Sequence, residues 1–263
     1  MDRQVSLSWQ GTGLTDTGLV RQTNQDAFVV DNDLGLWIVA DGMGGHAGGG
    51  TASRLAVKAV NGHIASSAIS FPDSHNRVDQ ADGILVSAVA AADSLIRATA
   101  ETTPALKGMG TTIVIGLFCP GPEPSIVLAH LGDSRAYLIR AQCITALTTD
   151  HSLVQRLVSE ARISLEEART HPRQNVLLRA VGMEDRSPPD VTIHPLQPHD
   201  ILILCTDGLT KMLEDQEILD YALVFQGSPG EMCRQLIDAA NSRGGKDNTT
   251  VLVIAPSRTD SKY

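Results

Sequence analysis

Five aspartates stand beside short apolar runs and are the residues of this chain best suited to chemistry. Asp41 follows Leu36-Trp37-Ile38-Val39-Ala40, Asp207 ends a similar run, and each is followed by glycine. The others are Asp26, Asp133 and Asp247. In an antiparallel sheet the end of one strand lies beside the start of the next. The spacing therefore predicts that the five carboxylates share one edge.

Carboxylates gathered in this way could hold divalent cations. Hard oxygen ligands without histidine or thiolate partners favour Mg²⁺ or Mn²⁺ over Zn²⁺. Two such ions that share a carboxylate can lower the pKa of a bridging water and direct it at a phosphorus centre. Asp41 is the best candidate for the shared ligand, and the Gly42 carbonyl is available as a further ligand.

The other four aspartates are expected to complete the centre. Asp207 and Asp247 would finish the shell of the second ion, and Asp26 would ligate directly or hold a metal-bound water. Asp133 would lie at the margin of the metal centre and is a candidate ligand of a third, weaker ion. A single aspartate beside a strand is more often a turn or cap residue, so the prediction depends on the whole set.

A phosphate substrate needs a protein cation as well. The planar fork of arginine matches phosphate oxygens better than lysine does. Arg21 lies five residues before Asp26 and could reach the same edge, the alternative being a solvated surface arginine. His46 is a candidate proton donor to a leaving oxygen, the alternative being a histidine that packs or caps a helix start.

Short apolar runs predict the strands that position these residues. The strands from residue 111 to 147 follow one another directly, which indicates antiparallel pairing rather than alternating strand and helix units. A Gly/Thr-rich turn is expected after Trp9 and a hairpin turn over 31–35. The expected strands cover 5–9, 27–30, 36–40, 111–118, 125–131, 134–140, 143–147, 191–194, 201–206 and 249–254.

Helical periodicity predicts helices over 51–64, 81–101, 215–224 and 229–241. Residues 150–174 are charged and mostly helical in pattern, with a capping box at Ser164 to Glu167. This segment is either a mobile lid or an ordinary surface helix pair. The polar tail from Pro256 is expected to fray.

Composition narrows the class of protein. The chain has 263 residues and a net charge of -9, which argues against nucleic acid or an anionic membrane as the main partner. Site candidates spread over the whole chain favour one domain over 1–255, with an insertion at 150–174 and a tail at 256–263. Since no signal region or run of roughly 20 apolar residues is evident, we expect a cytoplasmic protein and a monomer.

Cysteine spacing is consistent with this location. The chain has four cysteines and no Cys-x-x-Cys motif, which indicates free buried thiols in a reducing compartment. They are Cys119, Cys143, Cys205 and Cys233.

Six ordered motifs resemble those of metal-dependent PP2C-type (PPM family) serine/threonine phosphatases, most closely the compact bacterial members. The similarity covers nearly the whole chain. The motifs are Thr15-Asp16-Thr17-Gly18 with Arg21 and Asn24-Gln25-Asp26, Asp41-Gly42-Met43-Gly44-Gly45-His46, Met109-Gly110-Thr111-Thr112, Gly132-Asp133-Ser134-Arg135, Asp207-Gly208 and Gly245-Lys246-Asp247-Asn248.

The resemblance implies an α+β fold, a four-layer α-β-β-α sandwich of two antiparallel sheets packed face to face and flanked by helices. It implies that a hydroxide bridging two Mn²⁺ or Mg²⁺ ions attacks phosphoserine or phosphothreonine directly, opposing a bacterial Ser/Thr kinase. Phosphorylated proteins, and the kinase or its targets, would be the partners. The segment after Asp150 resembles the flap of the family. The implied metal residues are Asp26, Asp41, Gly42, Asp133, Asp207 and Asp247, and Arg21 would bind the substrate phosphate.

Two positions depart from animal relatives. Met43 replaces a histidine proposed as general acid, and Gln25 replaces a glutamate ligand. The proton donor is therefore left open between His46, a metal-bound water and none.

Three other functions agree less well with the sequence. A dinucleotide fingerprint over 42–47 lacks the acidic residue expected about 20 residues later. A metal-dependent phosphodiesterase or nuclease would share the aspartates but not the acidic surface. A catalytically silent regulatory or phosphoprotein-binding module would be expected to lose metal ligands, and none of the six implied metal residues is lost.

Overall fold

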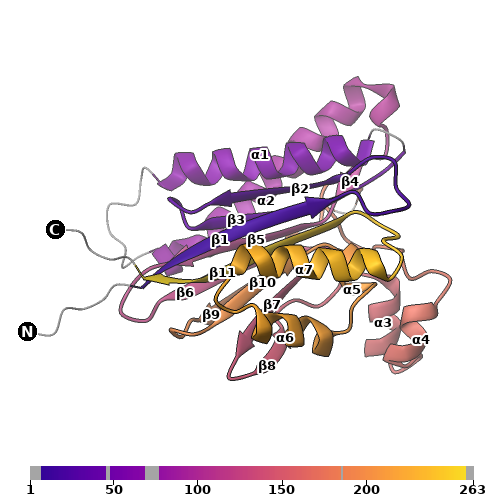
Figure 1. The fold of residues 1–263 in the computed structure, drawn as a ribbon. Helices are drawn as coiled ribbons and strands as arrows, with labels where there is room; N and C mark the ends of the chain where they lie inside the picture. The colour runs from indigo at the N-terminus through magenta and orange to yellow at the C-terminus, as the bar shows by residue number, and fades with distance from the viewer. Residues whose placement is uncertain (1–6, 46–47, 69–76, 185, 259–263) are drawn as a thin grey trace, which may run out of the picture.

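Two antiparallel sheets packed face to face form the centre of the molecule (Figure 1). The computed structural model describes residues 7–45, 48–68, 77–184 and 186–258. Helices cover the outer face of each sheet, so the predicted four-layer α-β-β-α sandwich is confirmed.

The strand order shows how distant segments meet. The first sheet runs β1 (Leu7–Asp16), β11 (Thr249–Arg258), β10 (Ile201–Cys205), β7 (Arg135–Arg140) and β8 (Cys143–Ala146). The second runs β2 (Asp26–Asp31), β3 (Leu36–Met43), β5 (Ile113–Cys119), β6 (Ser125–Leu131) and β9 (Asp190–Pro195), with β4 (Gly110–Thr111) paired to the end of β3. All these pairings are antiparallel, as predicted, and β2 and β3 form the expected hairpin.

Burial on both faces explains the continuous apolar runs of the central strands. In β3, Leu36 and Ile38 face the helices over the second sheet, whereas Trp37 and Val39 face the other sheet. Side chains of a strand alternate between its two faces. Both faces are therefore apolar, and the strand has no polar position until Asp41 at its end.

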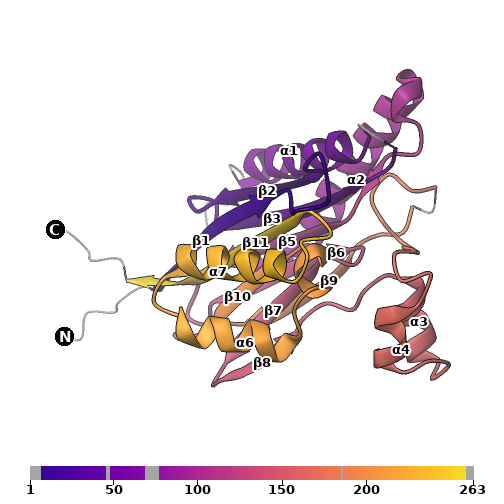
Figure 2. The ribbon, with the colours of Figure 1, turned by 45° about the vertical axis from the view of Figure 1, so that its right-hand side comes forward.

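The helices are divided between the two outer faces. Over the second sheet lie α1 (Gly48–Ala68) and α2 (Arg77–Thr102), and over the first lie α6 (Asp215–Val224) and α7 (Pro229–Ser242). A single turn, α5 (Asp207–Thr210), follows β10, and a 3₁₀ turn (Pro104–Leu106) follows α2. The predicted insertion contains α3 (Leu153–Ser159) and α4 (Leu165–Thr170), which project away from the sheets (Figure 2). Its predicted capping box between Ser164 and Glu167 is present.

One helix of the described residues, α2, is long and apolar enough to span a membrane by length and composition alone. The expectation that no segment comes near this limit was therefore too strong. Leu85, Val89 and Ile96 of α2 are nevertheless buried in the core that the helix shares with α1 and the second sheet. A core helix of a globular domain passes the same test.

Two strand boundaries were predicted wrongly. β1 continues through the expected Gly/Thr-rich turn to Asp16, because it pairs with β11 along its whole length. A side chain at Gly11 would collide with the ring of Trp37, so this glycine makes room for an aromatic of the other sheet. β11 likewise continues past Pro256 to Arg258, where the tail was expected to fray, because β1 supplies backbone partners. The expected strand over 5–9 lies partly outside the described residues.

The cysteine prediction is confirmed in part. All four thiols are free, and Cys119, Cys205 and Cys233 are buried. Cys143 is exposed, contrary to expectation, because it begins β8 at the outer edge of its sheet. Burial raises the pKa of Cys205 to about 12, so this thiol is protonated at neutral pH.

Replacement of Gly11 by alanine tests the packing between the sheets. The added Cβ would lie 2.2 Å from Trp37 Nε1, and we expect Gly11→Ala to lower the free energy of unfolding by about 2 kcal/mol or more. Gly62→Ala is the control, because a side chain at this exposed helix position meets nothing within 4 Å. This substitution should raise the free energy of unfolding by about 1 kcal/mol, since alanine favours a helix over glycine. Urea unfolding followed by circular dichroism measures both. Equal effects of the two variants would contradict this account.

Candidate active site

The five aspartates meet at one end of the sandwich, with contributions from both sheets. Asp26 begins β2 opposite Asp41 near the end of β3, and Asp133 follows β6. Asp207 opens α5 directly after β10, and Asp247 precedes β11. The predicted gathering is thus observed, although the carboxylates share the end of a two-sheet sandwich rather than the edge of one sheet.

Asp26 is held by two threonine hydroxyls of the opposite sheet. Its Oδ2 accepts hydrogen bonds from Thr206 Oγ1 at 2.8 Å and Thr250 Oγ1 at 2.7 Å. Its Oδ1 is buried without a hydrogen-bond partner. Burial, with a smaller contribution from Asp207 and Asp247, raises the pKa of Asp26 to about 7 against the opposing effect of these hydrogen bonds.

Asp41 is fixed through its backbone. Its N–H donates to Thr112 Oγ1 at 2.9 Å, and its carbonyl accepts from Thr111 Oγ1 and from the N–H of Thr112. Desolvation raises the pKa of the Asp41 carboxyl well above its usual range, and the other four aspartates raise it further. Asp41 is therefore close enough to each of the other four carboxylates to be repelled by it.

Gly42 lies where no side chain could fit. A Cβ at this position would be 2.0 Å from the carbonyl oxygen of Gly49 and 2.7 Å from that of Gln25. The Gly42 N–H donates to the Gln25 carbonyl at 3.2 Å. The turn from β3 into α1 is thus closed by backbone contacts directly beside Asp41.

Asp133 and Asp207 are buried together with a lysine that the sequence analysis missed. The ammonium of Lys211 forms an ion pair with Asp207 Oδ2, while Asp207 Oδ1 is buried without a hydrogen-bond partner. Burial, together with the charge of Asp207, raises the pKa of Asp133 to about 8, against the opposing effect of Lys211. Burial alone would lower the pKa of Lys211, but Asp207, Asp133 and Asp247 together raise it. The amine therefore stays protonated.

Arg21 reaches the site as predicted. Its Nη2 donates to Asp247 Oδ2 at 2.8 Å, and half of the Arg21 side chain is exposed. Asn248 holds the loop that carries Arg21, because its Nδ2 donates to the carbonyls of Thr17 and Thr23. The Asn248 Oδ1 accepts from the N–H of Gln25 at 2.8 Å. One amide side chain thus joins the Arg21 loop to the strand that follows Asp247.

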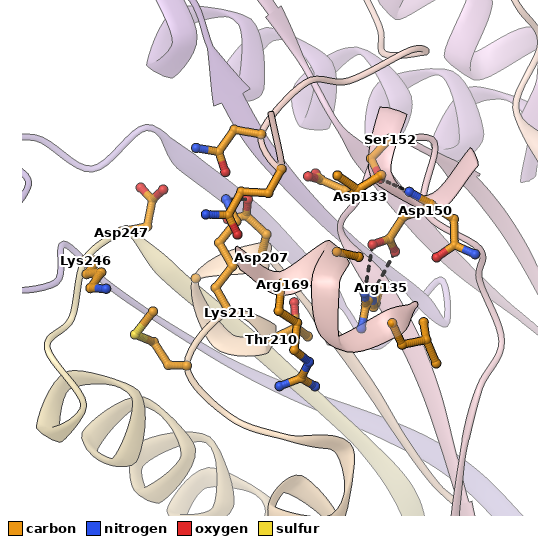
Figure 3. Close-up of a pocket in the computed structure, with 18 of the residues that line it drawn as sticks. Asp133, Arg135, Asp150, Ser152, Arg169, Asp207, Thr210, Lys211, Lys246 and Asp247 are labelled. Atoms are coloured by element: carbon orange, nitrogen blue, oxygen red, sulfur yellow. Dashed lines mark hydrogen bonds and ion pairs between the residues drawn. The ribbon is translucent and has the colours of Figure 1, made fainter. Parts of the chain in front are cut away.

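A cavity of about 520 Å³ opens beside these carboxylates (Figure 3). Asp133, Asp207, Asp247 and Arg21 line it on the side of the sheets. The helices of the insertion line it as well, through Val154, Gln155, Leu165, Ala168 and Arg169. The insertion is therefore part of the pocket wall and not a helix pair remote from it.

A second missed feature supports the wall of this cavity. Arg135 forms a two-armed ion pair with Asp150, with both N–O distances 2.7 Å. Its third nitrogen donates to the Tyr137 hydroxyl, which donates to Asp215. This network connects the start of the insertion to β7 and α6. Arg135 stands in the quoted Gly132-Asp133-Ser134-Arg135 motif, but its partners are too distant in sequence to be deduced from spacing.

The donor set fits hard divalent cations. Asp26 Oδ1 and Asp207 Oδ1 are buried without partners, and neighbouring carboxylates repel one another unless positive charge is supplied. Within the described ranges, no three Asp, Glu, His or Cys side chains already stand close enough to hold an ion. Arg21 and Lys211 pair with Asp247 and Asp207 instead. His46, the candidate proton donor, lies outside the described residues.

The family model for protein phosphatase 2C matches residues 17–241. This chain belongs to the protein phosphatase 2C family. Among its relatives, the serine/threonine phosphatase stp of Listeria welshimeri is 38% identical over 243 residues, which cover 91% of this chain and 93% of the relative. The resemblance inferred from the six motifs is confirmed.

Solved structures of phosphatases in this family share the fold. The serine/threonine phosphatase Stp1 of Staphylococcus aureus matches with a TM-score of 0.84 and 33% identity, over 97% of this chain and 98% of Stp1. The catalytic domain of the serine/threonine protein phosphatase PstP, in complex with two manganese ions, matches with a TM-score of 0.80 and 33% identity. That match covers 95% of this chain and 99% of the PstP chain.

The raised carboxyl pKa values predict how the stability of the metal-free protein depends on pH. Asp26 and Asp133 have pKa values of about 7 and about 8 in the folded state, against an ordinary value of 3.8. At pH 6.5 the folded protein holds protons that the unfolded chain has lost, so the free energy of unfolding falls as the pH rises. Histidines with lowered pKa, such as His130 at about 3, oppose this trend only below about pH 6.5.

We therefore expect the unfolding midpoint in EDTA to fall by about 5 °C between pH 6.5 and 8.5, equivalent to about 2 kcal/mol in a domain of this size. Differential scanning calorimetry measures it. Asp26→Asn should show a smaller fall, whereas Asp33→Asn, in the exposed hairpin turn, should keep the full fall. A midpoint that is constant or rises over this range would be inconsistent with buried, mutually repelling carboxylates.

Proposed function

We propose that this protein hydrolyses phosphoserine and phosphothreonine in other proteins, at a centre that holds Mn²⁺ or Mg²⁺. The observation that supports this most directly is the pair of unpartnered buried oxygens, Asp26 Oδ1 and Asp207 Oδ1, in a carboxylate cluster beside Arg21. Relatives named serine/threonine phosphatase, and a relative with two manganese ions, favour the enzyme over a silent regulatory module.

Each residue has a distinct part in this proposal. Asp41, the Gly42 carbonyl, Asp207 and Asp247 would hold two ions, with Asp26 in support. The ions, when bound, supply Lewis acidity that activates water and offsets phosphate charge. A third, weaker ion is the predicted partner of Asp133.

Arg21 would bind the phosphate of the substrate. Its guanidinium is half exposed and paired with Asp247. The exposed fork could turn from Asp247 toward phosphate oxygens, which it matches with two parallel hydrogen bonds. The charge of the guanidinium would then stabilise the transferring phosphoryl group, whose negative charge is spread over three equatorial oxygens in the transition state.

The surroundings of the site are also proposals. Residues 1–255 would form one catalytic domain in which 150–174 serves as a flap over the pocket. An ion pair between Arg169 of α4 and Glu214 beside α6 joins this flap to the main body. We expect a monomer in the cytoplasm that acts on the phosphorylated targets of a Ser/Thr kinase, or on the kinase itself.

Removal of the cations or of their ligands should abolish activity. Phosphate release from a phosphothreonine peptide is measured with Mn²⁺ and with EDTA. We expect EDTA, Asp41→Asn and Asp207→Asn each to lower the rate about 100-fold or more, because several kcal/mol of charge stabilisation is lost. Asp33→Asn in the exposed hairpin turn is the charge-matched control and should keep the wild-type rate. Activity that survives both chelation and the two ligand substitutions would refute the proposed centre.

Substitution of Arg21 should separate charge from geometry. We expect Arg21→Ala to lower kcat/KM about 100-fold, and Arg21→Lys to recover only part of it, because a lysine keeps the charge without the planar fork. Steady-state kinetics on the phosphothreonine peptide in Mn²⁺ measures both. Arg54→Ala, an exposed arginine of α1, is the control and should behave as wild type. An Arg21→Ala enzyme with unchanged kcat/KM would rule out the phosphate-binding role.

A further inference from the structure

Lys211 places a positive charge inside the carboxylate cluster, and none of the proposed catalytic steps uses it. The residue follows α5 directly, and its N–H donates to the Asp207 carbonyl at 2.8 Å. This single helical turn brings the Lys211 ammonium back onto Asp207 Oδ2, four residues earlier in the chain. Only 27% of the Lys211 side chain is exposed, although the residue as a whole lies at the surface.

The same ammonium acts on more than one carboxylate. In Figure 3, Lys211 and Asp207 lie between Asp133 and Asp247, and the ammonium interacts electrostatically with all three aspartates. Asp133 and Asp207 in turn repel each other. Lys211 thus places a positive charge from within the chain beside these two buried acids.

An exposed lysine would not have this consequence. A solvated ion pair contributes little, because water screens it. A largely buried ammonium beside buried carboxylates is different, since removal of one partner leaves an uncompensated charge. A divalent ion bound by Asp133 and Asp207 would meet the charge of Lys211 and compete for the oxygen that the ammonium occupies.

We propose that Lys211 is a built-in cation that takes the place of the third divalent ion beside Asp133 and Asp207, so that the protein binds two divalent ions and strongly disfavours a third. This inference rests on the proposed two-ion metal centre. It replaces the third, weaker ion that was expected beside Asp133. Lys211 is accordingly a positioning residue, which fixes the orientation of Asp207.

Counting bound Mn²⁺ tests the proposal without a measurement of activity. Equilibrium dialysis, with free Mn²⁺ followed by electron paramagnetic resonance, gives the number of ions and their dissociation constants. We expect two ions in the wild-type protein. Lys211→Met keeps the length of the side chain without its charge and should bind a third ion about tenfold or more tightly than the wild type, because the ion no longer meets a positive charge.

Three further variants test whether the number of bound Mn²⁺ ions depends on the charge at residue 211 and on Asp133. Lys211→Arg keeps a positive charge and should remain at two ions. Lys246→Met removes a lysine from the exposed rim of the same cavity and should also remain at two. Addition of Asp133→Asn to Lys211→Met should remove the third ion again, which places that ion beside Asp133.

Failure of this inference and failure of the proposed function would give different Mn²⁺ binding results. A wild-type protein that binds no Mn²⁺ would overturn the metal centre itself. A wild-type protein that binds a third ion as tightly as Lys211→Met does would overturn only the role of Lys211. Circular dichroism confirms that each variant is folded, and Lys211→Gln replaces Lys211→Met if the latter is not. The wild-type titration is decisive by itself if three ions bind with similar affinity.

Discussion

Repulsion among buried carboxylates is the constraint on which the functional end of this molecule depends. Burial and the neighbouring acids raise the pKa of Asp26, Asp41 and Asp133, so the folded chain keeps these groups together against an electrostatic cost. Such an arrangement persists only if the rest of the structure over-determines it. The cost is offset where positive charge arrives, whether from a side chain of the protein or from a bound ion.

The sandwich supplies the rigidity that this repulsion requires. Strands buried on both faces cannot slip by one residue, because a slip would move every side chain to the opposite face. The register that pairs Asp26 with Asp41 is therefore fixed far from the site, by the packing of β2 and β3 between helices and the first sheet. The threonines that hold Asp26 come from the other sheet, so the contact between sheets also positions the carboxylate.

Much of the architecture could be predicted because it follows from local rules. Apolar runs gave the central strands, helical periodicity gave α6 to the residue, and the capping box at Ser164 was correct. The course of β1 through Gly11 could not be predicted, because glycines usually mark turns and the reason for this one is a tryptophan of another strand. The aspartates were found because each borders an apolar run. Lys211 was missed because its role depends on a single helical turn at the end of a strand, which has no periodicity to detect.

Two basic side chains occupy the positions at which the site needs positive charge, and their different exposure gives them different roles. Arg21 is half exposed on a loop held by Asn248, so it can leave Asp247 at small cost and turn toward a substrate. The Lys211 side chain is less exposed than that of Arg21, and the single turn of α5 holds it against Asp207. A charge that must move with each substrate is therefore placed at the surface, whereas a charge that must remain is placed within the cluster. The same distinction explains why a fork suits the first position and a compact ammonium the second.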